Sequence, residues 1–249
     1  MWPWGLSVAL LAVRLTVAVA LSPALAAYGI PATVRLALVF ALAALTFAHR
    51  PPLAAAAGWM SAPGSLLAAV AAEVMIGALH GLALHVVMAA LVLAGRLMDV
   101  QIGFAIGSIF DPVTQASSNV LGSLVSLLGV TLFVLGDVHL RLAQLVSQSI
   151  DVLPLGELPT LAEPGRPLLA AGAMFTLGAA FAAPVAAALL LTDIAIGVAS
   201  RNMPQLNVLI LAMPVKVVVG YAVLALSVAS WGPWLQQGLD RTIAAMGLL

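Results

Sequence analysis

The chain has 249 residues, of which 63% are hydrophobic and only 7% are charged. A soluble globular domain carries about 25% charged residues because its surface must face water, so the composition excludes a soluble protein. The nine basic and nine acidic residues cancel, which argues against nucleic acid as a partner, since that binding depends on neutralising phosphates. The absence of cysteine excludes thiol catalysis, disulfides and cysteine-ligated metal sites. The sequence therefore indicates a membrane-embedded or membrane-derived protein.

Six apolar runs are long enough, or nearly long enough, to cross a bilayer as helices. A spanning helix needs about 20 apolar residues, and the alternating pattern of a membrane β-barrel is absent. The sequence therefore predicts an all-α protein of membrane-derived helical hairpins, forming one domain over residues 1–249. The runs cover approximately residues 5–30, 33–48, 66–95, 119–136, 168–200 and 208–230.

The segment between the third and fourth runs, residues 101–120, combines polar and apolar residues in an unusual way. It is rich in glycine, serine and other small polar residues, and it is broken by Asp111-Pro112. It also carries large apolar side chains, among them Phe104, Ile106, Ile109 and Phe110. Irregular backbone at membrane depth is tolerated only when it is buried in protein or lines a cavity. From the residues alone, packing against partners and a place inside a pore both remain open.

A seventh helix of different character is predicted over residues 137–152. Its apolar side chains fall on one helical face and its polar side chains on the opposite face, with the 3.6-residue period of an amphipathic helix. This pattern suits the membrane interface or the surface of a partner protein. Residues 153–167, which follow, contain four prolines and two glutamates and are expected to form a solvated loop.

Two charged residues in the last two apolar runs are predicted to pair. A charge at the bilayer centre costs about 2.5–3.5 kcal/mol on insertion scales. If these runs form an antiparallel hairpin turning near Pro204, Asp193 lies 11 residues before the turn and Lys216 lies 12 after it. The equal depth predicts a buried ion pair, which we interpret as a latch between two helices rather than as part of a proton path.

Two further charges lie in earlier runs. Arg14 has no carboxylate at matching depth within its own hairpin, so it either snorkels to the interface or meets an acid from a partner chain. Glu73 shares a helix face with Gly77 and His80. A carboxylate and an imidazole could relay protons, but an interfacial glutamate beside a hydrogen-bonded buried histidine is the favoured interpretation. We expect Arg14 and Glu73 to face partner subunits.

Signatures of enzymes are missing from the sequence. It contains no HExxH zinc motif, no GxSxG nucleophile turn, and neither of the glycine-rich phosphate-binding patterns, Walker A and GxGxxG. The sequence therefore predicts no enzyme activity, no cofactor, no metal and no nucleotide-driven step in this chain.

Several motifs occur in a fixed order along nearly the whole chain. Arg14 precedes Ser22-Pro23, and Glu73-xxx-Gly77-xxx-Gly81 leads to Asp111-Pro112. The last group is Asp193-Ile194-Ala195-Ile196-Gly197, Pro204-Gln205-Leu206-Asn207 and Met213-Pro214-Val215-Lys216. With these motifs the chain resembles the FliR/SctT family, the R (or T) subunit of the type III secretion export gate. It departs from the family at Gly136-Asp137-Val138-His139, where Asn-Gly-His is common.

The resemblance implies a non-enzymatic pore and gate subunit of the flagellar export apparatus in the bacterial inner membrane. One copy would join the P and Q subunits (FliP and FliQ) in a helical core, with the B and A export subunits (FlhB and FlhA) nearby and unfolded proteins as substrates. The family's plug loop maps onto residues 104–122. The plug and gating residues would be Phe104, Ile106, Ile109, Phe110, Asp111 and Pro112.

Two alternatives to the flagellar assignment stay open. The first is the corresponding T subunit of an injectisome, which belongs to the same family. The second, from another class, is a self-contained transporter of ions or small molecules. Such a transporter would couple transport through the ionisable residues near mid-membrane, namely Asp193, Lys216, Glu73 and His80.

Overall fold

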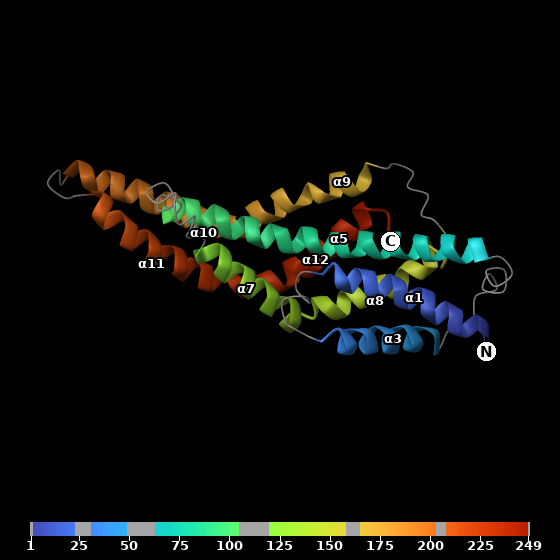
Figure 1. Cartoon of the computed structure of the whole chain (residues 1–249). Helices are drawn as coiled ribbons and strands as arrows, with labels where there is room; N and C mark the ends of the chain where they lie inside the picture. The colour runs from blue at the N-terminus through green and yellow to red at the C-terminus, as the bar shows by residue number, and fades with distance from the viewer. Residues whose placement is uncertain are drawn as a thin grey trace, which may run out of the picture. The chain divides into compact units, whose positions relative to one another are not determined.

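The computed structural model describes residues 2–22, 31–48, 63–104, 120–157, 165–202 and 208–248. Within these ranges the regular structure is helical, with no strand, which confirms the predicted all-α class (Figure 1). The helices are α1 (Trp2–Ala20), α3 (Ala32–Ala48), α5 (Pro63–Ile102), α7 (Val120–Leu135), α8 (Val138–Val152), α9 (Arg166–Ala171), α10 (Ala173–Asn202), α11 (Val208–Val228) and α12 (Trp231–Ala245).

Helices appear at each predicted run and at the amphipathic segment, but the run predicted over residues 168–200 is divided into α9 and α10 at Gly172. Residues 23–30 of the first run lie outside the described residues. Two helix ends also differ from the prediction. Helix α1 ends at Ala20 rather than near residue 30, just before Ser22-Pro23, because a residue that precedes proline is biased away from helical geometry. Helix α5 is longer than predicted, with 40 residues. Its C-terminal extension includes Arg96, Asp99 and Gln101. These polar residues interrupt the apolar run but do not end the helix.

Helix α12 was missed by the sequence analysis. Its glutamines and charged residues hide it from a search for apolar runs, yet every fourth side chain is apolar and buried. These side chains are Trp231, Leu235, Leu239 and Ile243. The polar face is also used, since Arg141 of α8 makes two hydrogen bonds to the Asp240 carboxylate, at 2.9 and 3.1 Å. An amphipathic period over this segment was the available signal.

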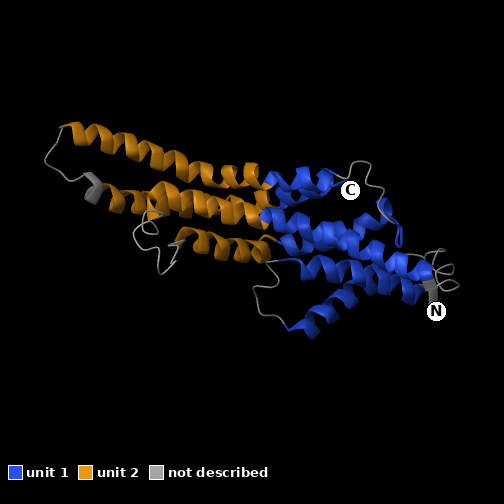
Figure 2. Cartoon of the chain, turned by 45° about the horizontal axis from the view of Figure 1, so that its top comes forward, with its two compact units in different colours: residues 1–87, 137–173, 236–249 blue, residues 88–136, 174–235 orange. Residues whose placement is uncertain are grey.

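The contacts divide the chain into two compact units, which Figure 2 colours separately. Unit 1 contains residues 1–87, 137–173 and 236–249, and unit 2 contains residues 88–136 and 174–235. Each unit is therefore assembled from segments far apart in the sequence. The expectation of one domain over residues 1–249 stays a prediction.

In unit 1, glycines on α5 let the backbone of α1 pack against it directly. A Cβ atom added at Gly77 would lie 2.5 Å from the Arg14 carbonyl oxygen, and one at Gly81 would lie 2.7 Å from the Leu21 Cβ. Helix α1 also packs against α3 and α8. The Gly77-xxx-Gly81 spacing therefore serves as a close-packing face of the kind that membrane helices use.

Unit 2 uses small residues in the same way. A Cβ at Gly95 of α5 would lie 2.6 Å from the Cα of Gly122 in α7. In α10 a Cβ at Gly178 would lie 3.0 Å from the Ala90 carbonyl oxygen of α5. Helices α7 and α10 are thus both held at backbone contact distance from α5.

Among the described residues, two helical stretches are long and apolar enough to span a membrane, namely Gly64–Ile102 and Arg166–Arg201. The number rises to four if two bent pairs, α7 with α8 and α11 with α12, each count as one span. The chain itself buries 61% of the most apolar 18-residue stretch in the first of these, but only 28% of the corresponding stretch in the second. Most of α10 therefore needs a covering that the chain does not supply.

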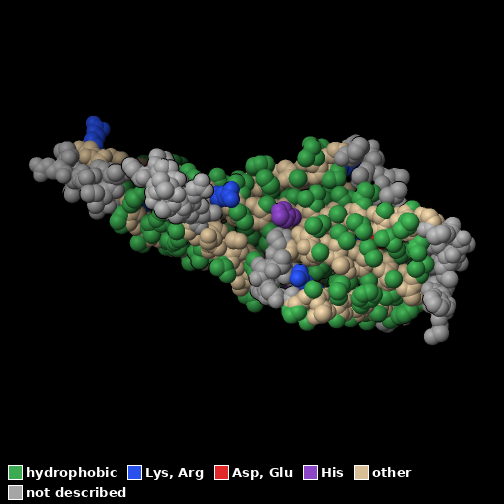
Figure 3. Space-filling view, in the orientation of Figure 1, with side chains coloured by type: hydrophobic (Ala, Val, Ile, Leu, Met, Phe, Trp, Pro, Cys, Tyr) green, Lys and Arg blue, Asp and Glu red, His purple; other side chains and the backbone are tan. Residues whose placement is uncertain are grey.

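The exposed surface of α10 is strongly apolar. Its large side chains with exposed fractions between 55% and 67% are Phe175, Leu190, Leu191, Ile194 and Val198. Figure 3 shows hydrophobic side chains dominating one face of the molecule, with few charges among them. Apolar surface of this extent is covered by lipid or by other protein chains, not by water. This agrees with the membrane class that the composition predicts.

We expect Gly77→Val to weaken the packing of α1 on α5. The added Cβ would meet the Arg14 carbonyl oxygen at 2.5 Å, and overpacking of this kind costs about 1–3 kcal/mol. Thermal unfolding of the full chain in detergent measures the loss. Gly197→Val in α10 is the matched control, because a Cβ there meets nothing within 4 Å. Equal midpoints for the two variants would contradict the direct contact.

Candidate functional site

The ends of α5 and α7 meet at the carboxylate of Asp99, on either side of the loop that the sequence analysis singled out. Asp99 is 4% exposed, and its two oxygens accept hydrogen bonds from the backbone amides of Leu121 and Gly122, both at 2.9 Å. Amides in the first turn of a helix have no partner within the helix, and a carboxylate there also complements the helix dipole. Asp99 therefore caps α7 from the last turn of α5.

The backbone around Asp99 is equally constrained. The Gly103 amide donates to the Asp99 carbonyl oxygen at 3.1 Å, and Gly103 has a φ of 102°, which favours glycine. Gly95 and Gly122 are in backbone contact one turn away. The beginning and the end of the loop segment are thus fixed close to each other, at what we call the loop base: Gly95, Asp99, Gly103, Leu121 and Gly122.

Lys216 and Asp193 form the ion pair that the hairpin arithmetic predicted. The ammonium group of Lys216 also donates to the carbonyl oxygen of Gln101 in α5, at 3.5 Å. This contact connects α10 and α11 to the last turn of α5, two residues from Asp99. The side chains of Lys216 and Asp193 are 18% and 42% exposed in the chain alone, so the chain itself does not enclose the pair, and its predicted burial stays a prediction.

Most of the predicted plug residues lie outside the described residues. Of the set, Phe104 is described, directly after Gly103, and its side chain is partly exposed. The others are Ile106, Ile109, Phe110, Asp111 and Pro112. Their assignment to a plug stays a prediction.

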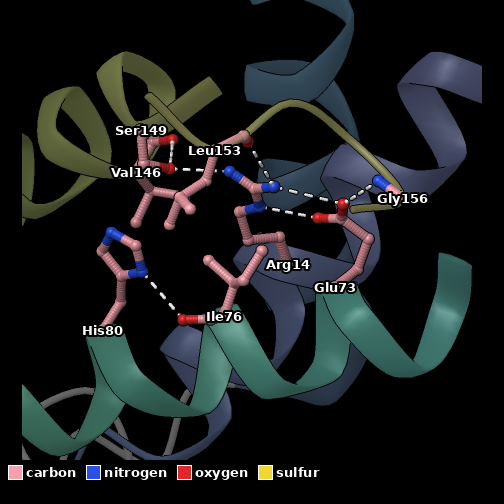
Figure 4. Close-up of polar contacts among 8 residues, drawn as sticks. All are labelled: Arg14, Glu73, Ile76, His80, Val146, Ser149, Leu153 and Gly156. Atoms are coloured by element: carbon pink, nitrogen blue, oxygen red, sulfur yellow. Dashed lines mark hydrogen bonds and ion pairs between the residues drawn. The ribbon is translucent and has the colours of Figure 1, made fainter. Parts of the chain in front are cut away.

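In unit 1 the guanidinium of Arg14 is completely buried and paired with Glu73 (Figure 4). Arg14 Nε donates to Glu73 Oε2 at 2.6 Å and Nη2 donates to Oε1 at 3.1 Å. Nη1 donates to Ser149 Oγ at 2.7 Å, and Nη2 also donates to the Leu153 carbonyl oxygen at 3.1 Å. A planar guanidinium offers such a bidentate fork to a carboxylate. Four hydrogen bonds therefore tie α1 to α5, to α8 and to the turn after α8.

This arrangement corrects the expectation that Arg14 and Glu73 face partner subunits. Both side chains are fully buried within the chain, and each is the other's counter-ion. The counter-ion of Arg14 does not lie in the helix next to α1 along the chain, which is the only helix that a hairpin pattern considers. The acid comes from α5, 59 residues along the chain.

The expected solvated loop after α8 is also corrected in its first part. Leu155 is 1% exposed, and the amide of Gly156 donates to Glu73 Oε1 at 2.8 Å. Gly156 has a φ of 78°, so the backbone turns there in a conformation that favours glycine. The turn is held in place because Glu73 and Arg14 satisfy its backbone.

His80 does not continue the Glu73 carboxylate into a proton relay in the described structure. Its Nδ1 lies 2.8 Å from the Ile76 carbonyl oxygen one turn back in α5. Its Nε2 is buried without a hydrogen-bond partner among the described residues. Both oxygens of Glu73 are engaged by Arg14, and one of them also by Gly156. Within the ranges described, no group of three or more side chains suited to a metal ion was found.

Asp99 and Ser149 are functional contacts that the sequence patterns did not predict. A signal for Asp99 did exist, because an acidic residue in the last turn of a helix opposes the helix dipole and needs donors from elsewhere. The apolar helix that begins at residue 120 supplies two such amides. Ser149 carried no comparable signal, since a serine on an amphipathic helix is ordinary.

Comparison with known proteins gives a match along nearly the whole chain. Residues 6–242 match the family model described as "Bacterial export proteins, family 1". The chain is 30% identical to the flagellar biosynthetic protein FliR of Bacillus subtilis, over 61% of this chain and 60% of that protein. It is 28% identical to FliR of Escherichia coli, over 85% of this chain and 80% of that protein.

A secretion system apparatus protein is similar as well. The secretion system apparatus protein SsaT of Salmonella typhimurium is 30% identical over 61% of this chain and 60% of that protein. The aligned part of the chain thus spans about three fifths of the Bacillus relative's length and 59% of the FliR of Pectobacterium carotovorum.

We expect the single variants Arg14→Met and Glu73→Gln each to destabilise the chain by about 3–5 kcal/mol, because each disrupts a buried ion pair. The double variant Arg14→Met with Glu73→Gln should lose less than the sum of the two single losses. Thermal unfolding in detergent completes the cycle. Arg141→Gln is the control, since that ion pair with Asp240 is about one third exposed and such pairs contribute little. Additive losses in the Arg14 and Glu73 cycle would show that the two side chains are not coupled.

We expect Asp99→Asn to loosen the loop base. An asparagine can accept a hydrogen bond with only one of its two terminal atoms, so one amide of α7 loses its acceptor, at a cost of about 1–3 kcal/mol. Hydrogen exchange of the Leu121 and Gly122 amides should accelerate about tenfold or more. Asp151→Asn, at an exposed position of α8, should leave both rates unchanged. If the exchange rates of these two amides are unchanged in Asp99→Asn, Asp99 does not cap α7.

Proposed function

The chain belongs to bacterial export proteins family 1, and from this membership we propose that it is a non-enzymatic pore and gate subunit of the flagellar type III protein export apparatus. The match over residues 6–242 carries the proposal, because it includes the helices of both units and the loop between α5 and α7. The relatives that carry the names FliR and SsaT support the export function.

The gate in this proposal is the loop segment of residues 104–122. Its large apolar side chains are Phe104, Ile106, Ile109 and Phe110. A hydrophobic constriction excludes ions and water by dewetting, so side chains of this kind suit a plug, and Asp111-Pro112 adds a rigid break within it. An unfolded substrate would displace the plug sterically, which requires no catalytic group from this chain.

The loop base supports this role physically. A plug that moves aside needs fixed ends, or its displacement would disrupt the packing of the helices on both sides. Asp99 holds the start of α7, and Lys216 holds the last turn of α5 through the Gln101 carbonyl oxygen. Asp193 neutralises Lys216, so in this proposal the two charges act as a latch at the loop base.

The proposed partners are the P and Q subunits, with the B and A export subunits next to them, in the bacterial inner membrane. The exposed apolar surface of α10 supports an assembly in which other chains cover it. The charges of Arg14 and Glu73 are already paired within the chain, so the partner contacts in unit 1 would not need to supply a counter-ion for them.

We expect deletion of residues 106–112 to leave assembly with P and Q intact and to make the membrane permeable to small ions. The deleted segment holds most of the apolar plug, while the loop base lies outside it. Ion leak of cells or liposomes containing the P, Q and variant subunits is the measurement. Deletion of residues 113–119, which has the same length and is mostly polar, is the matched control and should leak less.

If the membrane stays impermeable to small ions after deletion of residues 106–112, the loop is not a plug and only packs against neighbouring segments. Co-purification distinguishes the remaining alternatives. Capture of injectisome subunits in preference to FliP and FliQ would assign the chain to the virulence branch. A chain that is stable alone and moves ions without any partner would instead be a transporter.

A further inference from the structure

A pocket of about 240 Å³ lies in unit 1 between α1 and α3, and nothing in the proposed gate accounts for it. It lies toward the C-terminal end of α1 and the N-terminal part of α3. It is lined by Thr16, Val19, Ala20, Ala32, Arg35, Leu36 and Val39. This volume falls just below the range of about 300–1,000 Å³ that is usual for ligand pockets, so it suits part of a chain-like molecule.

Arg35 supplies the positive charge of the pocket. Its Nε is buried and has no hydrogen-bond partner among the described residues. A buried donor without an acceptor is destabilising, and more so when the group is charged. The guanidinium fork matches the paired oxygens of phosphate and carboxylate groups. The charge of Arg35 therefore favours an anionic ligand in this pocket.

The rest of the pocket lining favours a ligand with a hydrocarbon part. Apart from Arg35 and Thr16, the lining residues are aliphatic. The hydroxyl of Thr16 donates to the Ala12 carbonyl oxygen at 2.6 Å within its own helix, so its proton is already used. A small inorganic anion would satisfy Arg35 but leave these aliphatic walls uncovered.

The outer surface of α3 indicates where such a ligand comes from. Its exposed large side chains are all apolar: Val34, Leu36, Leu38, Phe40 and Leu45. Leu36 belongs to both this surface and the pocket, so the two are continuous. A molecule reaching the pocket along α3 therefore travels over hydrocarbon-like surface, as an acyl chain does in a bilayer.

We propose that the pocket binds an anionic phospholipid, with the headgroup phosphate on Arg35 and part of one acyl chain between α1 and α3. A zwitterionic lipid also carries a phosphate, but its ammonium group competes for that phosphate, so an anionic lipid is preferred. The lipid would complete the packing of the α1 and α3 pair where the two helices leave space. This site is independent of the loop base, which lies in unit 2.

The test uses the full-length chain, purified in mild detergent and mixed with equal amounts of phosphatidylglycerol and phosphatidylcholine. Native mass spectrometry counts the retained lipids. The parent chain should retain one phosphatidylglycerol in preference to phosphatidylcholine, and Arg35→Gln should weaken that preference about tenfold or more. Arg96→Gln, an exposed arginine of α5, is the matched control and should bind like the parent.

A second variant keeps the charge and fills the space. Ala20→Trp, at an exposed position that lines the pocket, should reduce retention of both lipids. Equal retention by the parent, Arg35→Gln and Ala20→Trp would overturn the proposal. So would displacement of the bound lipid by inorganic phosphate alone, which would mean a bare anion site. Loss of P-subunit binding in Arg35→Gln without any loss of lipid would assign Arg35 to a protein carboxylate instead.

Discussion

A charge among apolar helices is tolerated only where its counter-ion and its hydrogen-bond partners are within reach. This constraint organises unit 1. The guanidinium of Arg14 is fully buried, and its partners come from α5, from α8 and from the turn after α8. Removing any one of those elements would leave a buried charge with too few partners, so the ion pair with Glu73 makes these elements mutually dependent. The glycine face of α5 brings α1 close enough for this to happen.

The same constraint operates in unit 2, where it fixes the two ends of a loop instead of a core. Asp99 is nearly buried and finds its donors in the first turn of α7. Lys216 finds one acceptor in Asp193 and another in the last turn of α5. The segment from 105 to 119 is thus bounded by polar anchors, although it contains the large apolar side chains expected of a plug. The described residues on either side of this segment are therefore held by hydrogen bonds to charged side chains, as the proposed gate requires of its ends.

Besides these internal polar contacts, the chain has a large apolar surface that it does not cover itself. Helix α5 is largely enclosed by its own chain, whereas α10 is not. Apolar surface of this extent is covered by lipid or by other protein chains. The proposed lipid site between α1 and α3 concerns unit 1, whereas the exposed apolar side chains of α10 that support the proposed assembly with P and Q subunits belong to unit 2.

The sequence by itself determined the helical class, the places of the apolar helices, the amphipathic α8 and the pairing of Asp193 with Lys216. These follow from periodicity along one helix, or from equal depth in one hairpin, and both can be counted along the chain. The tertiary structure decided the partner of Arg14, the capping role of Asp99 and the packed turn at Leu155 and Gly156. Helix α12 could have been predicted from the sequence, because its apolar residues recur with an amphipathic period. Its polar residues keep it from forming a continuous apolar run, so it was not predicted. Contacts between distant helices depend on rotation and register, which no local pattern encodes, because every apolar face can pack against several others at similar free energy.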